Sequence, residues 1–505
     1  MRSHNSMMVA SALLALLVGC GGTKKPADVA TRPDGTKIVS LGGHAVSKQA
    51  KDDFDSGMAA FVQHDQANDW NASTCQSVAK QFETAVSENP DQKFTEALYD
   101  SGLAYQRCGD DKEARDRFQK ALSEQSSFHY ARAQIALYDF KTNGDVNAAI
   151  VQLQQAVKDA KFNNVPALVD LAMFQMLRDS QDPGGDTCRV NQNGKAVELA
   201  DFECSKINLQ RALSFDDSYM PAFNQLALYY FNGARKRAQT STTPGTATTK
   251  VTGGSFGHSI ATNAALGKRA DVQQLDLASL VCSQAQRKNP KYAPIHNTSG
   301  LILAENGQIN GAVNEFQAAV SLDTHFFEGF MNLAAVNLSF RGFDKAQAAY
   351  QQALTLHPND YDAHLGLALA YRGQITDQNY DAEVKLAAAE LDTCIKLDPN
   401  RPDAYFNKAI ITGEYLATHA DVAHSIPIYQ DAATLLTSFI QKAQGNSQYD
   451  GAVKAANDRL TDINDPDKGY LSLAKQTLQQ QQHPPPPPAP APAPSTPAPN
   501  PPAHP

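Results

Sequence analysis

Small and aromatic residues recur along the chain at a spacing of 34 positions. Gly300, Ala334 and Ala368 form one such series, and Phe316 and Tyr350 form a second. A period of 34 residues is the length of two helices with their connecting turns. Small residues are required where two helices cross closely, and aromatic residues fill the gap to the next pair. The spacing therefore predicts stacked pairs of helices.

The same signature recurs upstream, and looser copies extend it to about nine units. The upstream match consists of Leu98, Gly102, Tyr105, Ala114, Phe118 and Ala121. This order of residue types resembles the tetratricopeptide repeat (TPR) family, although the consensus tryptophan of that family is absent from the repeats. The resemblance implies an all-α fold, a right-handed superhelical solenoid over residues 47–435. Residues 436–483 are expected to form capping helices, because terminal repeats need a polar outer face.

Inserts interrupt several units, mostly at the turn between their two helices. The longest, at about 232–262, is rich in Thr, Gly and Ser, which favours a solvated surface insertion. A mobile partner-binding loop is the alternative. Within it, Gly253-Gly254-Ser255-Phe256-Gly257 fits the letters of a nucleophile elbow but lacks the preceding strand that this motif requires. We interpret Ser255 as a chance match and expect no enzymatic activity.

The N-terminus carries the pattern of an export signal. The apolar stretch 7–18 is shorter than the roughly 20 residues of a membrane span and fits the core of a signal peptide. It ends in Leu17-Val18-Gly19-Cys20, which resembles a bacterial lipobox. That resemblance implies removal of residues 1–19, lipidation of Cys20 and, with Gly21 following, a lipid-anchored protein of the outer membrane that faces the periplasm. An ordinary signal with a chance cysteine is the alternative.

The amino-acid composition predicts two non-helical segments and argues against one class of partner. Residues 20–46 have no hydrophobic periodicity and are expected to form a flexible tether. Residues 484–505 are mostly Pro and Ala, which predicts polyproline II, either as a solvated spacer or as a contact to peptidoglycan or wall proteins. The net charge of −9 argues against nucleic acid as a partner, because binding phosphates requires a basic face.

The export signal indicates that cysteines of this chain can form disulfides, since disulfides persist in an oxidising periplasm. Cys75 and Cys108 lie at neighbouring helix ends in adjacent units, and Cys188 and Cys204 flank an insert, so each pair is a disulfide candidate. The remaining two are expected to be buried thiols: Cys282 and Cys394. The cysteines lack paired C-x2-C spacing, and we predict neither a metal site nor a cofactor.

In the TPR family, the first helix of each unit lines a concave groove that holds partner peptides. Carried over to this chain, the resemblance implies a partner-binding groove that includes Tyr99, Leu103, Asn297, Leu301, Met331, Leu338, Leu365, Leu369, Arg372 and Phe406. The Lys and Asn set that clamps a C-terminal carboxylate is missing. An apolar floor of this kind suits an amphipathic helix or an extended apolar segment. The alternative is that some of these side chains pack against one another.

The lipobox, repeat array and proline-rich tail together resemble the TPR lipoproteins of bacterial motility machinery, particularly gliding complexes. The expected function is a non-enzymatic scaffold that binds other envelope proteins and organises a multiprotein complex. Two alternatives stay open: a pilotin-like factor for secretin or pilus assembly, and a periplasmic regulator of peptidoglycan synthesis.

Overall fold

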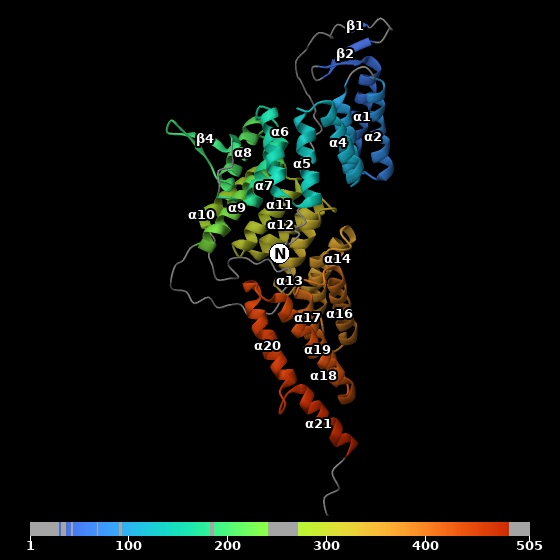
Figure 1. The fold of residues 1–505 in the computed structure, drawn as a ribbon, viewed down its shortest axis with the longest axis vertical. Helices are drawn as coiled ribbons and strands as arrows, with labels where there is room; N and C mark the ends of the chain where they lie inside the picture. Colours follow the sequence, from blue (N-terminus) through green and yellow to red (C-terminus); the bar gives the residue numbers. More distant parts are fainter. Residues whose placement is uncertain are drawn as a thin grey trace, which may run out of the picture. The chain divides into compact units, whose positions relative to one another are not determined.

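The computed structural model describes residues 30–31, 37–41, 44–67, 69–89, 93–181, 186–240 and 271–483. Across these ranges the chain is mostly helical (Figure 1). It divides into two compact units, each described by itself below. Unit 1 comprises residues 1–244 and 268–302, and unit 2 comprises residues 245–267 and 303–505.

Unit 1 is a succession of helices in which α1 to α10 each pack against their neighbours in sequence. Figure 1 shows α7, α8, α9 and α10 lying side by side in this way. The helices are α1 (Lys48–Ala67), α2 (Ala72–Ser87), α3 (Thr95–Arg107), α4 (Asp111–Glu124), α5 (His129–Asn143), α6 (Val146–Asp159), α7 (Val165–Arg178), α8 (Asp201–Phe215), α9 (Met220–Thr240), α10 (Val272–Lys288) and α11 (Ala293–Glu305), the last of which ends in unit 2.

Local sequence signals begin and end these helices. Asn71 forms a capping box with Thr74 at the start of α2, and Asp145 caps α6 by accepting bonds from the amides of Asn147 and Ala148. Such caps satisfy amide groups that have no partner within the helix. The apolar positions then face the neighbouring helices, where Phe82 and Phe118 are fully buried. The helix pairs are thus stabilised mainly by packing of their amphipathic faces.

Unit 2 continues the pattern of paired helices. Its elements are α12 (Ile309–Leu322), α13 (Phe327–Ser339), α14 (Phe343–Leu356), α15 (Tyr361–Gly373), α16 (Tyr380–Leu397), α17 (Asp403–Ile410), the π-helix η2 (Ile411–Leu416), α18 (Ala417–His419), α19 (Val422–Ala443), the short helix η3 (Ser447–Tyr449), α20 (Asp450–Asn464) and α21 (Tyr470–Gln482). The predicted fold class, an all-α array of TPR-like helix pairs, is confirmed. The predicted boundary between repeats and cap, at 435–436, lies inside α19.

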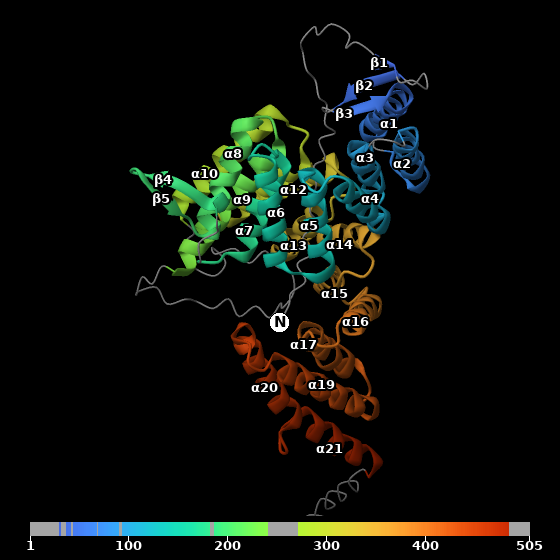
Figure 2. The same ribbon diagram turned by 45° about the horizontal axis from the view of Figure 1, so that its top comes forward.

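A small antiparallel sheet replaces part of the tether that we expected over residues 20–46. It contains β1 (Ala30–Thr31), β2 (Lys37–Leu41) and β3 (His44–Ser47), and in Figure 2 it lies beside α1. Ser47 ties the sheet to the end of α2, because its amide donates to the side-chain oxygen of Asn89 at 3.0 Å and its hydroxyl donates to the carbonyl of Glu88. Val46 is fully buried. The tether prediction was therefore wrong for residues 30–31, 37–41 and 44–46.

The inserts also differ from their predicted limits. Helix α9 continues to Thr240, so residues 232–240 belong to a helix and the long insert begins later than predicted. Ser255 and the rest of that insert lie outside the described residues, as do Cys20 and the proline-rich tail. In the fourth unit, the hairpin of β4 (Arg189–Gln192) and β5 (Lys195–Glu198) follows the short helix η1 (Asp186–Cys188).

No helix within the described ranges combines the length and the apolar character needed to cross a membrane.

Candidate functional site

The first helices of neighbouring pairs contact one another within each unit. In unit 1, α5 contacts α7 and α7 contacts α9, while in unit 2, α13 contacts α15. These helices form a shared face in each unit, which we call its inner face. It runs over α5, α7 and α9 in unit 1, with α3 joined by the ring contact between Tyr99 and Tyr130, and over α13 and α15 in unit 2. All ten predicted partner-binding residues belong to first helices. Whether a partner can reach them depends on how far each side chain is exposed.

Several of the predicted binding residues are buried in the helix packing. Leu103, Leu365 and Phe406 are at most 2% exposed, and the Phe406 ring packs against Phe439 with centroids 5.0 Å apart. Leu369 and Leu338 are also buried. These side chains hold helices together, because a residue without solvent access cannot receive a partner directly. Position within the repeat predicts the helix correctly but does not predict the depth of the side chain.

Other predicted residues keep partial solvent access. Leu301 and Met331 are half-buried, whereas Asn297 is buried, at 9% exposed. Arg372 is half-buried and donates from Nη1 to the side-chain oxygen of Asn407 at 3.2 Å. Burial lowers the pKa of Arg372, while Tyr415 and Glu414 oppose that shift. Leu301, Met331 and Arg372 thus remain the residues of the predicted set that a partner can reach.

Tyr99 lies in a group of aromatic rings on the inner face of unit 1. Its ring centroid is 5.9 Å from that of Tyr130 and 5.4 Å from that of Phe118. Burial and the carboxylate of Asp100 raise the pKa of Tyr99, and a hydrogen bond to Gln134 opposes this. The phenol is therefore neutral across the physiological range and acts as a hydrogen-bonding aromatic group.

The prediction missed a row of polar residues beside Tyr99. Asp100, Gln134 and Asp170 each stand two positions before the small residue of their repeat, which is Gly102, Ala136 or Ala172. They therefore occupy equivalent places on α3, α5 and α7. The signal was present in the repeat alignment, as a polar residue at an inner position between buried neighbours. The family pattern alone does not mark this position as a binding position.

The two aspartates of this row are in an unusual electrostatic environment. Both are half-buried, and burial raises the pKa of Asp100 to about 8, with Glu96 adding to the effect. Burial likewise raises the pKa of Asp170 to about 7. Burial among protein atoms disfavours the charged carboxylate unless a partner compensates it. Across the described part of the chain, neither aspartate has a hydrogen-bond or ion-pair partner.

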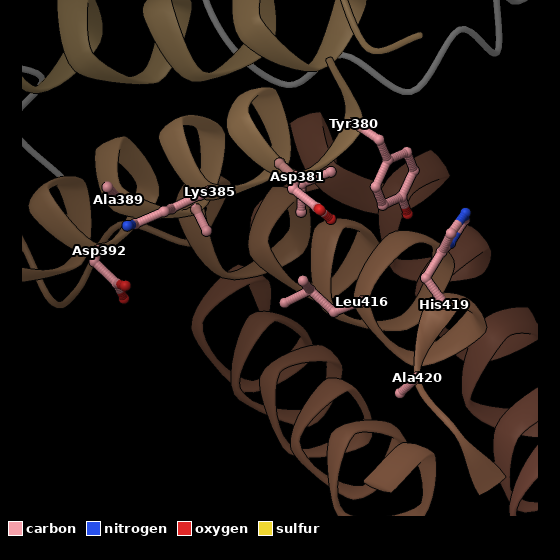
Figure 3. A pocket seen from close by; sticks show the side chains of 10 residues that line it. Tyr380, Asp381, Lys385, Ala389, Asp392, Leu416, His419 and Ala420 are labelled. Carbon is pink, nitrogen blue, oxygen red and sulfur yellow. The ribbon is translucent and has the colours of Figure 1, made fainter. Parts of the chain in front are cut away.

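A cleft of about 520 Å³ opens in unit 2 between α16 and the segment formed by η2 and α18. Figure 3 shows Tyr380 and His419 facing each other at one end, where their rings stack at 3.9 Å. Leu416 projects into the cleft and is 40% exposed. The volume and apolar floor suit an apolar side chain of a partner. The π-helix that shapes one wall has no signal in the repeat pattern, so the cleft could not be predicted.

The structure brings both predicted cysteine pairs to disulfide distance. The Cα atoms of Cys75 and Cys108 are 6.3 Å apart, and those of Cys188 and Cys204 are 5.0 Å apart. The first pair joins α2 to the end of α3, and the second joins η1 to α8. The other two cysteines of the described chain are buried and belong to neither pair: Cys282 and Cys394. Among the described residues, no cluster of three or more His, Cys, Asp or Glu side chains is arranged to hold a metal ion.

No protein-family model matches the chain. No curated protein matches it either. Solved structures do match. The chain is similar to TTC0263, a TPR protein of Thermus thermophilus, with 21% identity over 48% of this chain and 98% of that one, and a TM-score of 0.35. A TPR protein of Parabacteroides merdae matches with 13% identity over 66% and 99% of the two chains, and a TM-score of 0.36.

PilF of Pseudomonas aeruginosa matches with 14% identity over 53% of this chain and 94% of that one, and a TM-score of 0.33. At such identities and TM-scores, the fold assignment rests on the helix pairs described above.

Proposed function

We propose that this chain is a non-enzymatic scaffold whose inner faces bind segments of other proteins. The observation that carries the proposal is the contact between successive first helices, which joins α5, α7 and α9 in unit 1 and α13 and α15 in unit 2. Partly accessible apolar residues such as Met331 lie on these helices. Extended peptides and amphipathic helices bind to surfaces of this kind through a few apolar anchors.

We further propose that the scaffold is lipidated at Cys20 and anchored in the outer membrane, facing the periplasm. The lipobox-like sequence Leu17-Val18-Gly19-Cys20 supports this location. The two cysteine pairs at disulfide distance also support it, because disulfides persist in oxidising compartments. In this setting the partners are envelope proteins, with motility machinery as the leading candidate. A pilotin-like role and regulation of peptidoglycan synthesis are distinguished from it by the partners that are recovered.

A photo-crosslinking amino acid at position 331 tests the scaffold function. Met331 lies on α13, a first helix of unit 2, whereas Gln352 is an exposed residue on the second helix α14 and provides the matched control. We expect position 331, in cells, to yield specific crosslinks to motility subunits, and position 352 to yield few. Crosslinks to secretin subunits or wall synthases would move the protein to one of the other pathways. Equal crosslinking from both positions would contradict the scaffold proposal.

A second experiment tests the anchor separately. Cys20→Ala removes the only residue that the lipobox pattern offers for lipidation. We expect the variant to incorporate no labelled palmitate and to leave the membrane fraction, whereas the wild type incorporates label and sediments with outer membranes. Continued sedimentation of the variant with membranes would overturn the anchor while leaving the binding function open.

A further inference from the structure

The inner face of unit 1 carries two carboxylates surrounded by tyrosines. We define the tyrosine–aspartate surface as Tyr99, Asp100, Tyr130, Asp170, Tyr219 and Tyr292. Asp100 and Asp170 hold the same repeat position on α3 and α7, and Tyr99 and Tyr130 have ring centroids 5.9 Å apart. Asp170 lies within electrostatic range of both Tyr99 and Tyr219. Tyr219 also interacts electrostatically with Tyr99 and Tyr292, so the six residues form one connected group on or next to α3, α5, α7, α9 and α11.

The tyrosine–aspartate surface contains two carboxyl groups and no cationic side chain. Across the described residues, Asp100 and Asp170 form no ion pair and accept no hydrogen bond. Elsewhere in unit 1, half-buried carboxylates have cationic partners, as Asp65 has Arg107, with nitrogen–oxygen distances of 2.7 and 2.8 Å. Placing a carboxylate in a partly buried site without a partner costs free energy. A chain that carries this cost twice, at equivalent positions, offers two preformed sites for a positive charge.

We propose that the tyrosine–aspartate surface binds a lysine- or arginine-containing segment of a partner protein. Charge complementarity selects this occupant, because the ammonium or guanidinium group would supply the partners that Asp100 and Asp170 lack. The half-buried Tyr130 and Tyr292 favour the same chemistry, since aromatic faces attract cations through their negative quadrupole, whereas Tyr99 and Tyr219 are buried, at 7% and 5% exposed. The inference rests on the scaffold function proposed above and gives the chemistry of one bound segment.

The titratable groups around the two carboxylates determine how binding depends on pH. Glu96 and Tyr99 interact with Asp100, and Tyr99 and Tyr219 interact with Asp170. The titratable neighbours of these tyrosines are Tyr130, Tyr292 and Asp216, and His129 lies beside Tyr130. Burial raises the pKa of the four tyrosines, and it lowers that of His129, so these groups stay neutral above pH 7. The aspartates, with pKa values of about 8 and about 7, ionise between pH 6 and 9. Binding of a cationic peptide should therefore strengthen as the pH rises through that interval.

The test uses the full lipoprotein in mild detergent and fluorescein-labelled peptides of alternating Ser and Lys or Ser and Arg. A Ser and acetyl-lysine peptide of equal length is the uncharged control. By fluorescence anisotropy at pH 8.5, the cationic peptides should bind at least about tenfold more tightly than the control, since charge-assisted hydrogen bonds are roughly twice as strong as neutral ones. Their affinity should fall at pH 5.5. Equal binding of charged and uncharged peptides by the wild type would overturn the proposal.

Variants assign the effect to the two aspartates. Asp100→Asn with Asp170→Asn should weaken cationic binding about tenfold or more and flatten its pH profile. The matched control, Asp52→Asn with Asp53→Asn, makes the same change in net charge on the solvent-facing side of α1 and should leave binding unchanged. Equal loss in both double variants would show general charge attraction and overturn the proposal. Displacement of the peptide by millimolar Ca²⁺, with no preference for charged peptides, would point to a metal ion instead.

The aspartate variants are expected to fold. A carboxylate whose pKa is raised on folding lowers stability as the pH rises above its unfolded pKa, so its replacement by asparagine should leave the protein at least as stable at pH 8.5. Failure of this inference can be distinguished from failure of the scaffold proposal. If crosslinks form at position 331 while the aspartate variants bind cationic peptides normally, the scaffold stands and this inference fails.

Discussion

Gly102 on α3 is in direct contact with the ring of Phe118 on α4. A Cβ atom on Gly102 would lie 2.6 Å from Cε1, 2.9 Å from Cδ1 and 3.0 Å from Cζ of that ring. Phe118 is fully buried and cannot move away easily. The contact joins the two helices of one repeat, and it shows why a small residue and an aromatic residue recur together in the sequence.

Replacing Gly102 by alanine should destabilise this repeat. The new methyl group overlaps three ring atoms, and overpacking of a core costs about 1–3 kcal/mol. The gain in helix propensity recovers only about 0.5–1 kcal/mol. We therefore expect a net loss of about 1–2 kcal/mol, read as faster hydrogen exchange in peptides from α3 and α4. Unchanged protection of these peptides would show that the ring can shift.

Two companion variants control this measurement. Adding Phe118→Leu to Gly102→Ala removes the ring atoms that the methyl group meets, so the double variant should lose less than the sum of its parts. Gly451→Ala places a methyl group on α20 where no atom lies within 4 Å. That change should stabilise its helix by about 0.5–1 kcal/mol, because it gains propensity without overlap.

The repeat signature was sufficient to predict the paired helices and the pairing of Cys75 with Cys108. Gly57 and Phe82 in the first unit make the same kind of contact as Gly102 and Phe118, since a Cβ atom on Gly57 would lie 2.9 Å from the ring. Such contacts fix which residues of a sequence must be small. They act between neighbours in the repeat and so leave a periodic signal. The pairing of Cys75 with Cys108 followed from the same register.

Features that depend on contacts outside the repeat were not predictable in this way. The strands before α1 depend on Ser47, whose bonds to Glu88 and Asn89 join positions about 40 residues apart. The π-helix at 411–416 and the cleft beside it depend on how one long first helix packs against α16. The isolation of Asp100 depends on which side chains its neighbours in other repeats present. None of these leaves a periodic trace in the chain.

Removal of the cysteine pairs should show their contribution to stability. The double variant Cys75→Ala with Cys108→Ala opens a loop with a sequence separation of 33 and should cost about 3–4 kcal/mol. The variant Cys188→Ala with Cys204→Ala opens one of 16 and should cost about 3 kcal/mol. Urea unfolding with and without reductant measures both. Cys282→Ala is the control, because this variant keeps both cysteine pairs and reductant should lower its stability as much as that of the wild type. Free thiols at 75 and 108 under non-reducing alkylation would refute the first pair.

A buried ion pair holds the hairpin-containing insert of the fourth unit. Arg178 donates from Nε and Nη2 to the two carboxylate oxygens of Asp201, at 2.6 and 2.7 Å, and Asp201 is fully buried. The amide of Ser180 donates to the same carboxylate at 3.0 Å. Arg178→Ala leaves this carboxylate buried without a cation, which should cost about 3–5 kcal/mol. Thermal unfolding of unit 1, followed by hydrogen exchange in α7 and α8, measures the loss.

The hairpin itself supplies a matched control for that variant. Arg189 pairs with Glu198 at 2.6 Å, but their side chains are 52% and 35% exposed. Ion pairs in water contribute roughly 0–1 kcal/mol, so Arg189→Ala should hardly change stability. If Arg178→Ala and Arg189→Ala proved equally mild, water would have to replace the guanidinium at Asp201, and the carboxylate would not be as enclosed as the structure places it.

The stability of unit 2 should depend on pH through His364. Nδ1 of its ring lies 2.5 Å from Oε2 of Glu390, and Nε2 lies 2.9 Å from the carbonyl oxygen of Pro358. Both neighbours are acceptors, so the imidazolium, with two N–H groups, fits this position best. Burial alone would lower the pKa of His364, but the bonds to Glu390 and Pro358 outweigh it and raise the pKa above its usual 6.5.

A pKa that is raised on folding gives stability that is fully present below about pH 6.5 and is lost as the pH rises through the folded value. Urea unfolding of the wild type should therefore show the midpoint for unit 2 falling as the pH rises above about 6.5. His364→Gln should lack this part of the decline, and Glu390→Gln should reduce it, because a neutral amide no longer stabilises the imidazolium. A wild-type decline identical to that of both variants would mean that His364 stays neutral, and that one of its ring nitrogens faces an acceptor without donating a hydrogen bond.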